Sequence, residues 1–114
     1  MTDKQIYLRF LRMAEAIRDL PSFPALDVVE ERLLNVFAVA WGERRKITVL
    51  EAMRLLPDVS ESTVHRRLKS LRAKGMLTLI ADADDGRTRY VEPTSLADSY
   101  FERLAACMEK AQRE

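Results

Sequence analysis

The feature that most constrains the fold is a pair of closely spaced helix starts, followed at once by a change of hydrophobic period. Thr48 and Glu51 stand three residues apart, a spacing typical of the capping box that begins an α-helix. Ser60 marks a second helix start, and Gly75 marks the end of the helix that follows it. The sequence therefore predicts a short helix to about Leu56, a tight turn and a second helix to about Lys74, which is helix-turn-helix spacing.

After Gly75 the apolar pattern is typical of strands. Residues 76–81 form an apolar run with high β propensity, and residues 87–92 form a second, mixed run. The polar segment DADDG between them predicts a turn, in which Gly86 is free to adopt a positive φ. A helix-turn-helix followed directly by a β-hairpin is the order of a winged helix, whose wing is the hairpin.

The remaining segments predict helices on either side of this unit. Residues 3–20 carry apolar side chains at helical spacing, and two prolines then end that helix. Asp27 and Glu30 form another capping box, which begins a helix that Gly42 and the GERRK segment close. A last amphipathic helix follows Thr94. The predicted fold class is mainly α (α+β), a winged helix-turn-helix flanked by N- and C-terminal helices.

Composition excludes several classes of protein. The 114 residues, 47% hydrophobic and 32% charged, suit one globular domain rather than a disordered chain. One cysteine, Cys107, allows no intramolecular disulfide, and with the single histidine, His65, it cannot supply a Cys/His zinc site. The first residues have no signal or transit pattern, and no apolar run approaches the roughly 20 residues that span a bilayer. We therefore expect a cytoplasmic protein with no membrane segment, metal or other cofactor.

The net charge of +1 conceals one strongly basic segment. Residues 1–45 are balanced, with seven basic and seven acidic side chains. Within residues 60–75, five basic side chains stand against Glu61 alone, a difference of 5 − 1 = +4. A nearly neutral chain with one basic segment indicates a localised contact with a polyanion.

The basic helix has a core face and a polar face, because each residue turns the helix by about 100°. The polar face offers a hydroxyl, an imidazole and two cations for the major groove of DNA, from Ser62, His65, Arg66 and Lys69. Other side chains lie beside this face or in the first turn, where they suit phosphates: Ser60, Thr63, Arg67, Arg72 and Lys74. A merely solvated basic surface is the alternative, and the surrounding helix-turn-helix and hairpin favour nucleic acid.

The stretch from ITVLEAM to VEPTS resembles the winged-helix domain of MarR-family transcriptional regulators. Its most specific element lies in the hairpin, where the family has the pattern Asp-x-Arg-x-x-x-Val-x-Leu-Thr. Four residues match that pattern: Asp85, Arg87, Val91 and Thr94. Pro93 stands where leucine is usual, and the segment LRAKGML resembles the end of the family's recognition helix. The resemblance covers about residues 27–104. The chain departs from the family in its C-terminal region, which is shorter than family members usually have.

The resemblance implies roles for the hairpin. Arg87 would enter the minor groove, where arginine responds to groove width. Asp85 would brace the wing by hydrogen bonds, and Arg89 is a second candidate for the DNA backbone. The alternative is that both arginines merely keep an exposed hairpin soluble. The neighbouring carboxylates of the DADD segment lack the ligand number and spacing of a calcium loop.

The two end helices carry large apolar residues that a compact winged helix does not need in full, and exposed patches of this kind mark association surfaces. These residues are Ile6, Tyr7, Phe10, Ile17, Tyr100, Phe101, Leu104 and Met108. The resemblance implies a two-fold dimer in which the end helices of two subunits interdigitate. The alternative is that they fold back on their own domain. Cys107 is expected to be a packed thiol, with a redox-active thiol as the alternative.

No phosphate loop, metal motif or nucleophile arrangement indicates an enzyme. The sequence predicts a homodimeric, sequence-specific DNA-binding regulator of transcription, with repression the favoured sign and a small-molecule effector left open. A protein-interaction module, or a plasmid or phage protein of replication or partition, is the alternative. The expected organisation is an N-terminal dimerisation helix and linker (1–25), a DNA-binding winged helix (26–93) and a C-terminal dimerisation helix (94–114).

Overall fold

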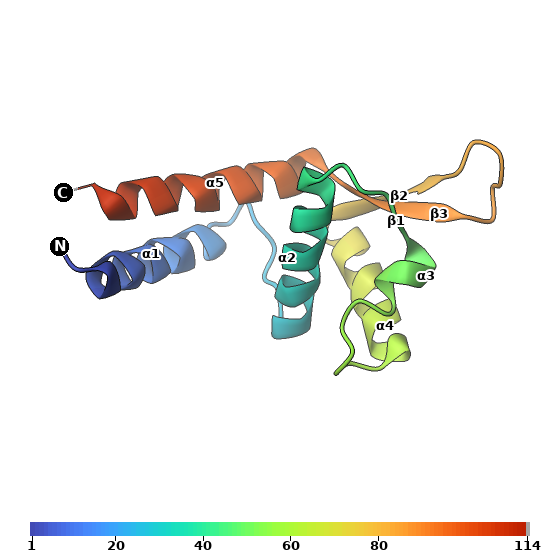
Figure 1. Cartoon of the computed structure of the whole chain (residues 1–114), viewed down its shortest axis with the longest axis horizontal. Helices are drawn as coiled ribbons and strands as arrows, with labels where there is room; N and C mark the ends of the chain where they lie inside the picture. Colours follow the sequence, from blue (N-terminus) through green and yellow to red (C-terminus); the bar gives the residue numbers. More distant parts are fainter. Residues whose placement is uncertain (114) are drawn as a thin grey trace. The chain divides into compact units, whose positions relative to one another are not determined.

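The computed structural model describes residues 1–113, which form two compact units (Figure 1). The helical unit comprises Met1–Ala25 together with the segment from Ser95 onward, and the winged unit is Leu26–Thr94. The helical unit holds α1 (Asp3–Arg18) and α5 (Ser95–Gln112). The winged unit holds, in chain order, α2 (Val28–Gly42), β1 (Ile47–Thr48), α3 (Val49–Ala52), α4 (Glu61–Ala73), β2 (Leu77–Ala81) and β3 (Arg89–Pro93). The chain is therefore mainly helical with one small sheet, as the sequence predicts.

The helix starts follow the predicted caps. Asp27 and Thr48 accept hydrogen bonds from the third residue of α2 and of α3, and both capping boxes are complete. Ser60 caps α4 by accepting from the backbone N–H of Thr63. These side chains satisfy backbone donors that would otherwise lack partners at a helix N-terminus. The helix-turn-helix prediction is confirmed, although α3 is shorter than expected and ends at Ala52.

Two helices of the winged unit end in the same hydrogen-bond motif. After α4, the N–H of Met76 donates to Leu71 O at 3.0 Å, and Gly75 adopts a φ of 79°. After α2, the N–H of Arg45 donates to Ala40 O at 2.9 Å, and Arg44 carries the positive φ of 59°. The helix ends at Gly42, as the sequence predicts, and its left-handed residue, Arg44, lies in the GERRK segment that was expected to close it.

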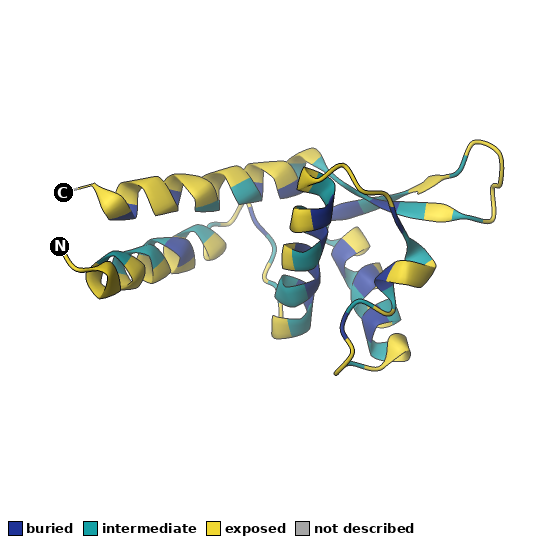
Figure 2. Ribbon diagram, viewed as in Figure 1, coloured by how far each residue is buried: buried dark blue, intermediate teal, exposed yellow. Residues whose placement is uncertain are grey.

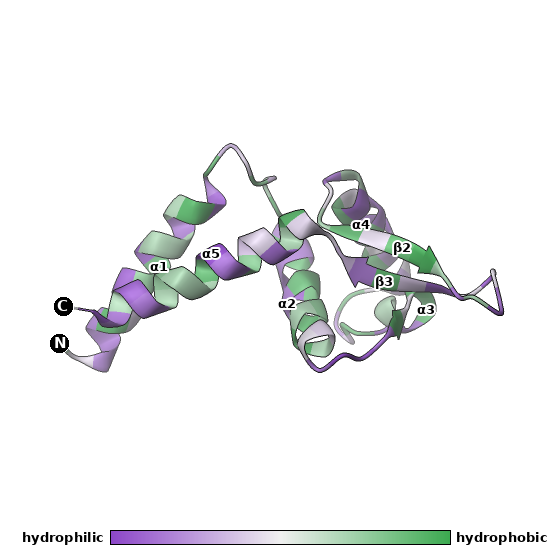
Figure 3. Ribbon diagram, turned by 90° about the horizontal axis from the view of Figure 1, so that it is seen from above, coloured by the Kyte–Doolittle hydropathy of each residue, from purple (hydrophilic) through white to green (hydrophobic). Residues whose placement is uncertain are grey.

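The wing is part of a three-stranded antiparallel sheet in the order β1-β3-β2. Val91 pairs with Ile47 on one side and with Leu79 on the other, so β3 is the central strand. Figure 3 shows β2 as mainly hydrophobic and β3 as mainly hydrophilic. The sequence predicted the hairpin but missed β1, which has only two residues. Gly86 does not use its freedom to adopt a positive φ; within residues 1–113 only Arg44 and Gly75 have one.

The core of the winged unit lies where the inner faces of α2 and α4 meet the base of the hairpin (Figure 2). Its largest buried apolar side chains come from α2, α4, the three strands and the turn before β2: Leu33, Leu34, Phe37, Ile47, Val64, Leu71, Met76, Leu77 and Val91. Trp41 packs against Phe37 and donates from Nε1 to the carbonyl of Val91 at 3.0 Å. This bond ties α2 to the central strand.

In the helical unit, α1 packs against α5. Ala14, Tyr100, Cys107 and Ala111 are buried, and the ring of Phe23 meets that of Tyr100 edge to face at 5.3 Å. The packed thiol expected at Cys107 is thus confirmed. None of the helices within residues 1–113 combines the length and apolar character needed to cross a membrane.

Candidate nucleic-acid interface

Helix α4 turns different sets of side chains in different directions. Its core face holds Val64, Leu68 and Leu71, all buried. With about 100° per residue, three further faces follow. We call them the clamp flank, beside α2, with Arg67, Ser70 and Lys74; the cleft flank, beside the hairpin, with His65, Lys69 and Arg72; and the outward face, with Ser62, Arg66 and Ala73.

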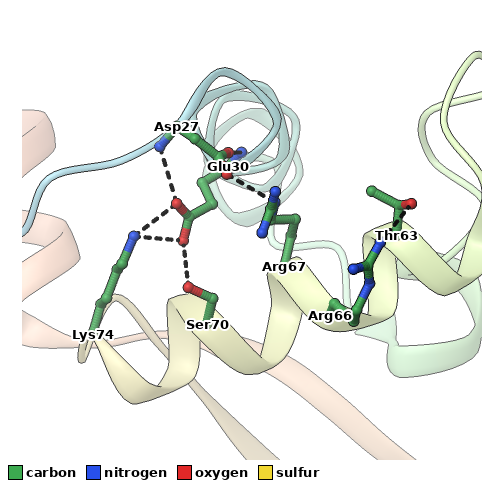
Figure 4. A network of polar contacts seen from close by, with 7 residues as sticks. All are labelled: Asp27, Glu30, Thr63, Arg66, Arg67, Ser70 and Lys74. Carbon is green, nitrogen blue, oxygen red and sulfur yellow. Dashed lines mark hydrogen bonds and ion pairs between the residues drawn. The ribbon is translucent and has the colours of Figure 1, made fainter.

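The clamp flank is held by a buried carboxylate. Glu30 of α2 is only 1% exposed, yet both its oxygens have partners. Lys74 Nζ lies 2.7 and 3.0 Å from the two oxygens, and Ser70 Oγ donates to Oε2 at 2.9 Å (Figure 4). The backbone N–H of Asp27 donates to Oε1 at 3.0 Å. A buried charge is tolerated only when it is paired and hydrogen-bonded in this way.

A second pair lies beside the first. Arg67 Nε is 2.8 Å from Oδ2 of Asp27, whose Oδ1 accepts from the N–H of Glu30 at 2.8 Å (Figure 4). The two residues of the α2 capping box therefore also hold α4. Arg67 and Lys74 were expected near DNA phosphates; the structure places both against carboxylates of their own chain instead.

The outward face carries one cation, Arg66, which has no such partner among residues 1–113. Ser62, Arg66 and Ala73 are exposed, as is the neighbouring Lys69. Arg66 Nη2 lies 3.3 Å from Thr63 Oγ1, its one polar contact, and no ion pair in the described part of the chain involves Arg66 or Lys69. The guanidinium group keeps most of its donors for a ligand.

The first turn of α4 is occupied by its own cap. Ser60 Oγ accepts from the N–H of Thr63 at 3.2 Å and donates to Thr63 Oγ1 at 2.8 Å. Ser60 Oγ also lies 3.3 Å from Ser62 Oγ. The hydroxyls predicted to meet phosphates thus form a small network at the helix N-terminus, where the helix dipole also favours an anion.

The cleft flank forms one wall of a small depression. The cleft has a volume of about 100 Å³ and is lined by Val49, His65, Leu68, Lys69, Arg72, Leu79 and Arg89. It brings residues from α3, α4 and both strands of the hairpin together. Four of the predicted DNA-contacting residues, three from α4 and one from the hairpin, thereby share one site.

The wing loop is fixed by two aspartates. Asp85 accepts from the N–H of Arg87 and from Thr88 Oγ1, each at 3.0 Å, consistent with the bracing role that the family resemblance implies for it. Asp82 Oδ2 accepts from the N–H groups of Asp84 and Asp85, each at 3.0 Å. Arg87 itself is exposed.

Asp82 also connects the loop to the sheet. Tyr90 Oη donates to Asp82 Oδ1 at 3.1 Å, and Lys46 Nζ lies 5.2 Å from the centre of the Tyr90 ring. The backbone N–H groups of Asp85 and Asp84, then the Tyr90 hydroxyl, hold the pKa of Asp82 below its ordinary value. The same hydrogen bond to Asp82 raises the pKa of Tyr90.

Sequence reasoning missed the supporting residues. Asp27 and Glu30 were interpreted only as a helix cap, although Ser70 and Lys74 stand four residues apart on one side of a helix, as partners of a shared carboxylate must. From the sequence, Asp82 was considered only as one of the DADD carboxylates that could hold a metal ion. Among residues 1–113, no three His, Cys, Asp or Glu side chains gather in a way that could hold a metal ion.

The residues predicted for a dimer interface divide into two groups. Tyr7 and Met108 are each 58% exposed and line a groove of about 260 Å³ between α1 and α5 with Ile6 and Phe10. Tyr100, in contrast, is buried in its own unit, where Arg18 Nε donates to its hydroxyl at 3.2 Å. Ile17, Phe101 and Leu104 are half-buried. Leu8 and Leu11, which the sequence analysis left out, are exposed beside Tyr7.

No family model matches the sequence, and no curated protein matches it. Solved structures do match its fold. A single-substitution mutant of S. aureus MepR bound to an oligodeoxyribonucleotide superposes with a TM-score of 0.68 at 15% identity, over 94% of this chain and 73% of that one. The transcriptional regulator Tm0710 of Thermotoga maritima gives 0.63 at 20% identity, over 92% and 66%. The heme sensor PefR of Streptococcus agalactiae, in complex with heme, gives 0.62 at 17% identity, over 91% and 65%.

These neighbours are MarR-family transcriptional regulators. The chain has their fold. The winged-helix prediction is thereby confirmed. The chain spans about two-thirds of the length of PefR and Tm0710.

Proposed function

We propose that this protein is a double-stranded DNA-binding transcriptional regulator that inserts α4 into the major groove and the wing into the neighbouring minor groove. The observation that carries the proposal is the position of the unpaired cations. Arg66 and Lys69 of α4 and Arg87 and Arg89 of the hairpin are exposed, and none has an ion pair within residues 1–113. A positively charged helix surface beside a positively charged hairpin is suited to contact the DNA backbone and the edges of bases in both grooves.

Roles follow from the faces of α4. Ser62 and Arg66 on the outward face would contact base edges, since arginine can hold a guanine by two hydrogen bonds. His65 and Lys69 would lie at the edge of that contact, and Arg72 against the backbone. The order imposed on the wing by Asp82 and Asp85 supports a minor-groove role for Arg87, because a fixed loop loses less conformational freedom on binding.

We propose that two copies associate through the helical unit. The exposed Tyr7, Leu8, Leu11 and Met108 support this, because a folded monomer rarely leaves such a patch uncovered. A two-fold dimer would present two α4 helices to half-sites about one turn of DNA apart. Bound in this way at a promoter, the dimer would exclude polymerase and repress transcription.

A salt titration tests DNA binding. The affinity of the full chain for a random duplex should fall steeply with salt, because bound phosphates release counterions. A protein-interaction module would show no appreciable binding even at low salt. The same measurement on fragments selected from a genome would then supply a preferred sequence.

On such a preferred sequence, Arg66→Ala should weaken binding by about 1–3 kcal/mol and relax base preference, whereas Arg72→Ala should weaken all duplexes alike. The ratio of affinities for the preferred and the random duplex separates the two effects. Equal losses on both duplexes for Arg66→Ala would contradict base contact by this residue.

Two of the solved neighbours hold small molecules: PefR was solved with heme and MepR with ethidium bromide. By analogy with these two proteins, this chain would also bind a small-molecule effector. Isothermal titration of heme and of ethidium into the full chain would test this. If neither compound gives heat of binding, the analogy with PefR and MepR fails.

A further inference from the structure

The DNA arrangement proposed above makes a geometric demand on the molecule. One sugar–phosphate strand separates a major groove from the minor groove beside it. If α4 occupies the first groove and the wing occupies the second, that strand must cross the molecule between them. We propose that the cleft between α4 and the hairpin is a binding site for one phosphate group of this strand. The inference rests on the proposed function and adds a ligand to its site.

The hairpin wall of the cleft is set by strand register. Ala81 pairs with Arg89, and Leu79 pairs with Val91. Paired residues share a face of the sheet, and alternate residues along a strand share it too. Arg89 therefore lies on the same face as the buried Val91, which is the face that carries Leu79 into the cleft. Its guanidinium extends the wall beyond the point where the apolar core ends.

The helix wall is equally regular. His65, Lys69 and Arg72 stand at helical positions i, i+4 and i+7, so their side chains emerge on one line along α4. Leu68 from the same helix and Val49 from α3 line the cleft with apolar surface. The apolar lining displaces water from one side of a bound anion, and that strengthens its attraction to the cations.

The charge of the cleft selects an anion. Three cations and one imidazole line it, and no carboxylate from residues 1–113 does. None of the three cations has an ion pair in the part of the chain that the structure describes. On the opposite flank of α4 each cation has a carboxylate within 3 Å, at 2.7 Å for Lys74 and 2.8 Å for Arg67. The cleft is thus a cationic site whose counter-charge must come from a ligand.

The size of the cleft selects a small anion. Its volume of about 100 Å³ is well below the roughly 300–1,000 Å³ of pockets that hold drug-sized ligands. A single phosphate group fits this scale, and an organic effector does not. Arg89 also lines a second, shallower hollow of about 380 Å³ with Arg87 and residues of α3, so cationic surface continues toward the wing loop. A phosphate strand can follow that surface.

The site changes the role of one residue. Lys69 was expected to contact bases, but as a wall of the cleft it contacts the backbone. Base readout is then left to Ser62 and Arg66 on the outward face. Lys69 sets the register of α4 on the duplex, together with Arg72 and Arg89.

The first arm of the test uses inorganic phosphate and the DNA-free full chain. Nitrogen-15 spectra should show saturable shifts of the Arg72 and Arg89 side-chain signals and of the His65 ring. Chloride at the same ionic strength should not produce them. Arg54, which is exposed and paired with Glu61 at 2.9 Å, serves as a reference arginine that should not shift. Equal shifts at Arg54 would overturn the site.

The second arm uses duplexes in which one phosphate at a time is replaced by an uncharged methylphosphonate. One position should weaken the wild-type chain about tenfold, as the loss of a charge-assisted hydrogen bond does. Lys69→Gln, Arg72→Gln and Arg89→Gln should each become insensitive to that position and remain sensitive to the others. Arg67→Gln, from the opposite flank, should keep the full wild-type sensitivity.

The outcomes are distinguishable. Variants that stay sensitive to every position would overturn the phosphate site while DNA binding stands. A wild-type chain that binds no duplex at low salt would overturn the proposed function, and the phosphate titration would still decide whether the cleft holds an anion. All three substituted side chains lie at the surface, so loss of folding is not expected to confuse the result.

Discussion

The two flanks of α4 carry similar basic side chains, but within residues 1–113 those on one flank are paired with carboxylates and those on the other are not. The clamp flank has Arg67 and Lys74, each against a carboxylate of α2 or its cap. The cleft flank has Lys69 and Arg72, with no carboxylate among the residues that line the cleft. A count of basic residues along the helix treats the four alike. The partner helix, not the recognition helix, decides which cations remain for a ligand.

The difference also separates two tasks. Cations on the clamp flank fix the orientation of α4 on its own domain, whereas those on the cleft flank remain free to contact another molecule. A recognition helix needs both, because a base contact is useful only if the helix axis is held in place. The predictions below test whether the two flanks divide the work in this way.

The largest effect is expected for Glu30→Ala. The substitution removes the buried partner of Ser70 and Lys74 and half of the α2 capping box, so the free energy of unfolding should fall by about 2–4 kcal/mol. Urea denaturation followed by circular dichroism measures it. Glu61→Ala, which breaks an exposed pair with Arg54, is the matched control and should change stability by no more than about 1 kcal/mol. Similar losses for both variants would mean that the clamp is an ordinary surface contact.

The next effect distinguishes Arg67 from Arg72. Arg72→Gln should reduce the slope of log affinity against log salt by about one on any duplex, since one phosphate contact is lost. Arg67→Gln should leave that slope unchanged and lower stability by up to about 1 kcal/mol, because its carboxylate partner is within the protein. A reduced slope for Arg67→Gln would show that the clamp opens when DNA binds, and the comparison between the flanks would fail.

A smaller effect is expected in the wing, which supplies the far wall of the cleft. The lowered pKa of Asp82 means that its ionised form is favoured in the folded protein. The stabilisation is therefore present above the unfolded pKa of about 3.9 and is lost as pH falls through the lower, folded value. Amide exchange at Asp84 and Asp85 should quicken in that acidic range. Asp82→Ala should show the fast exchange already at neutral pH, and unchanged exchange in this variant would contradict the bracing role.

The smallest effect is expected for Arg44→Gly. Relief of the left-handed conformation, less the entropy that glycine adds to the unfolded chain, should raise stability by about 0.5–1 kcal/mol. DNA affinity and its salt slope should not change, because Arg44 lies on neither flank. The variant thus changes the stability of the fold without changing the contacts of Glu30 and Asp27 with α4. A shift in its DNA affinity would show that stability alone controls binding.

Local signals allowed much of the fold to be predicted. The caps at Asp27, Thr48 and Ser60 and the glycine after α4 act within a few residues, so a single sequence shows them. Strand β1 escaped because two residues carry no periodicity of their own and pair only with a distant strand. Arg44 escaped because its conformation is imposed by the hydrogen bonds that close α2 rather than by an intrinsic preference.

The candidate site divides in the same way. Helical spacing alone predicts that Ser62 and Arg66 face away from the core, and both are exposed. It could not predict that Asp27 and Glu30, about 40 residues earlier in the chain, would lie against Arg67, Ser70 and Lys74. Nor could it predict that Arg89 would join the cleft, because that depends on the register of β2 and β3. Contacts between distant segments separate the paired cations from the free ones.

The double use of the α2 capping box has a practical consequence for re-engineering this protein. The residues that a designer would rewrite to change a target sequence are Ser62, Arg66 and Ala73. Within residues 1–113 none of them has a hydrogen bond or ion pair to α2, and Ser62 and Arg66 contact only the first turn of α4 itself. Ser70 and Lys74, on the clamp flank of the same helix, must be kept because they pair with the buried Glu30, or Glu30 must be replaced along with them. If the DNA specificity of another recognition helix is transferred to this protein, only the outward face of α4 should therefore be exchanged, and the clamp flank should be kept.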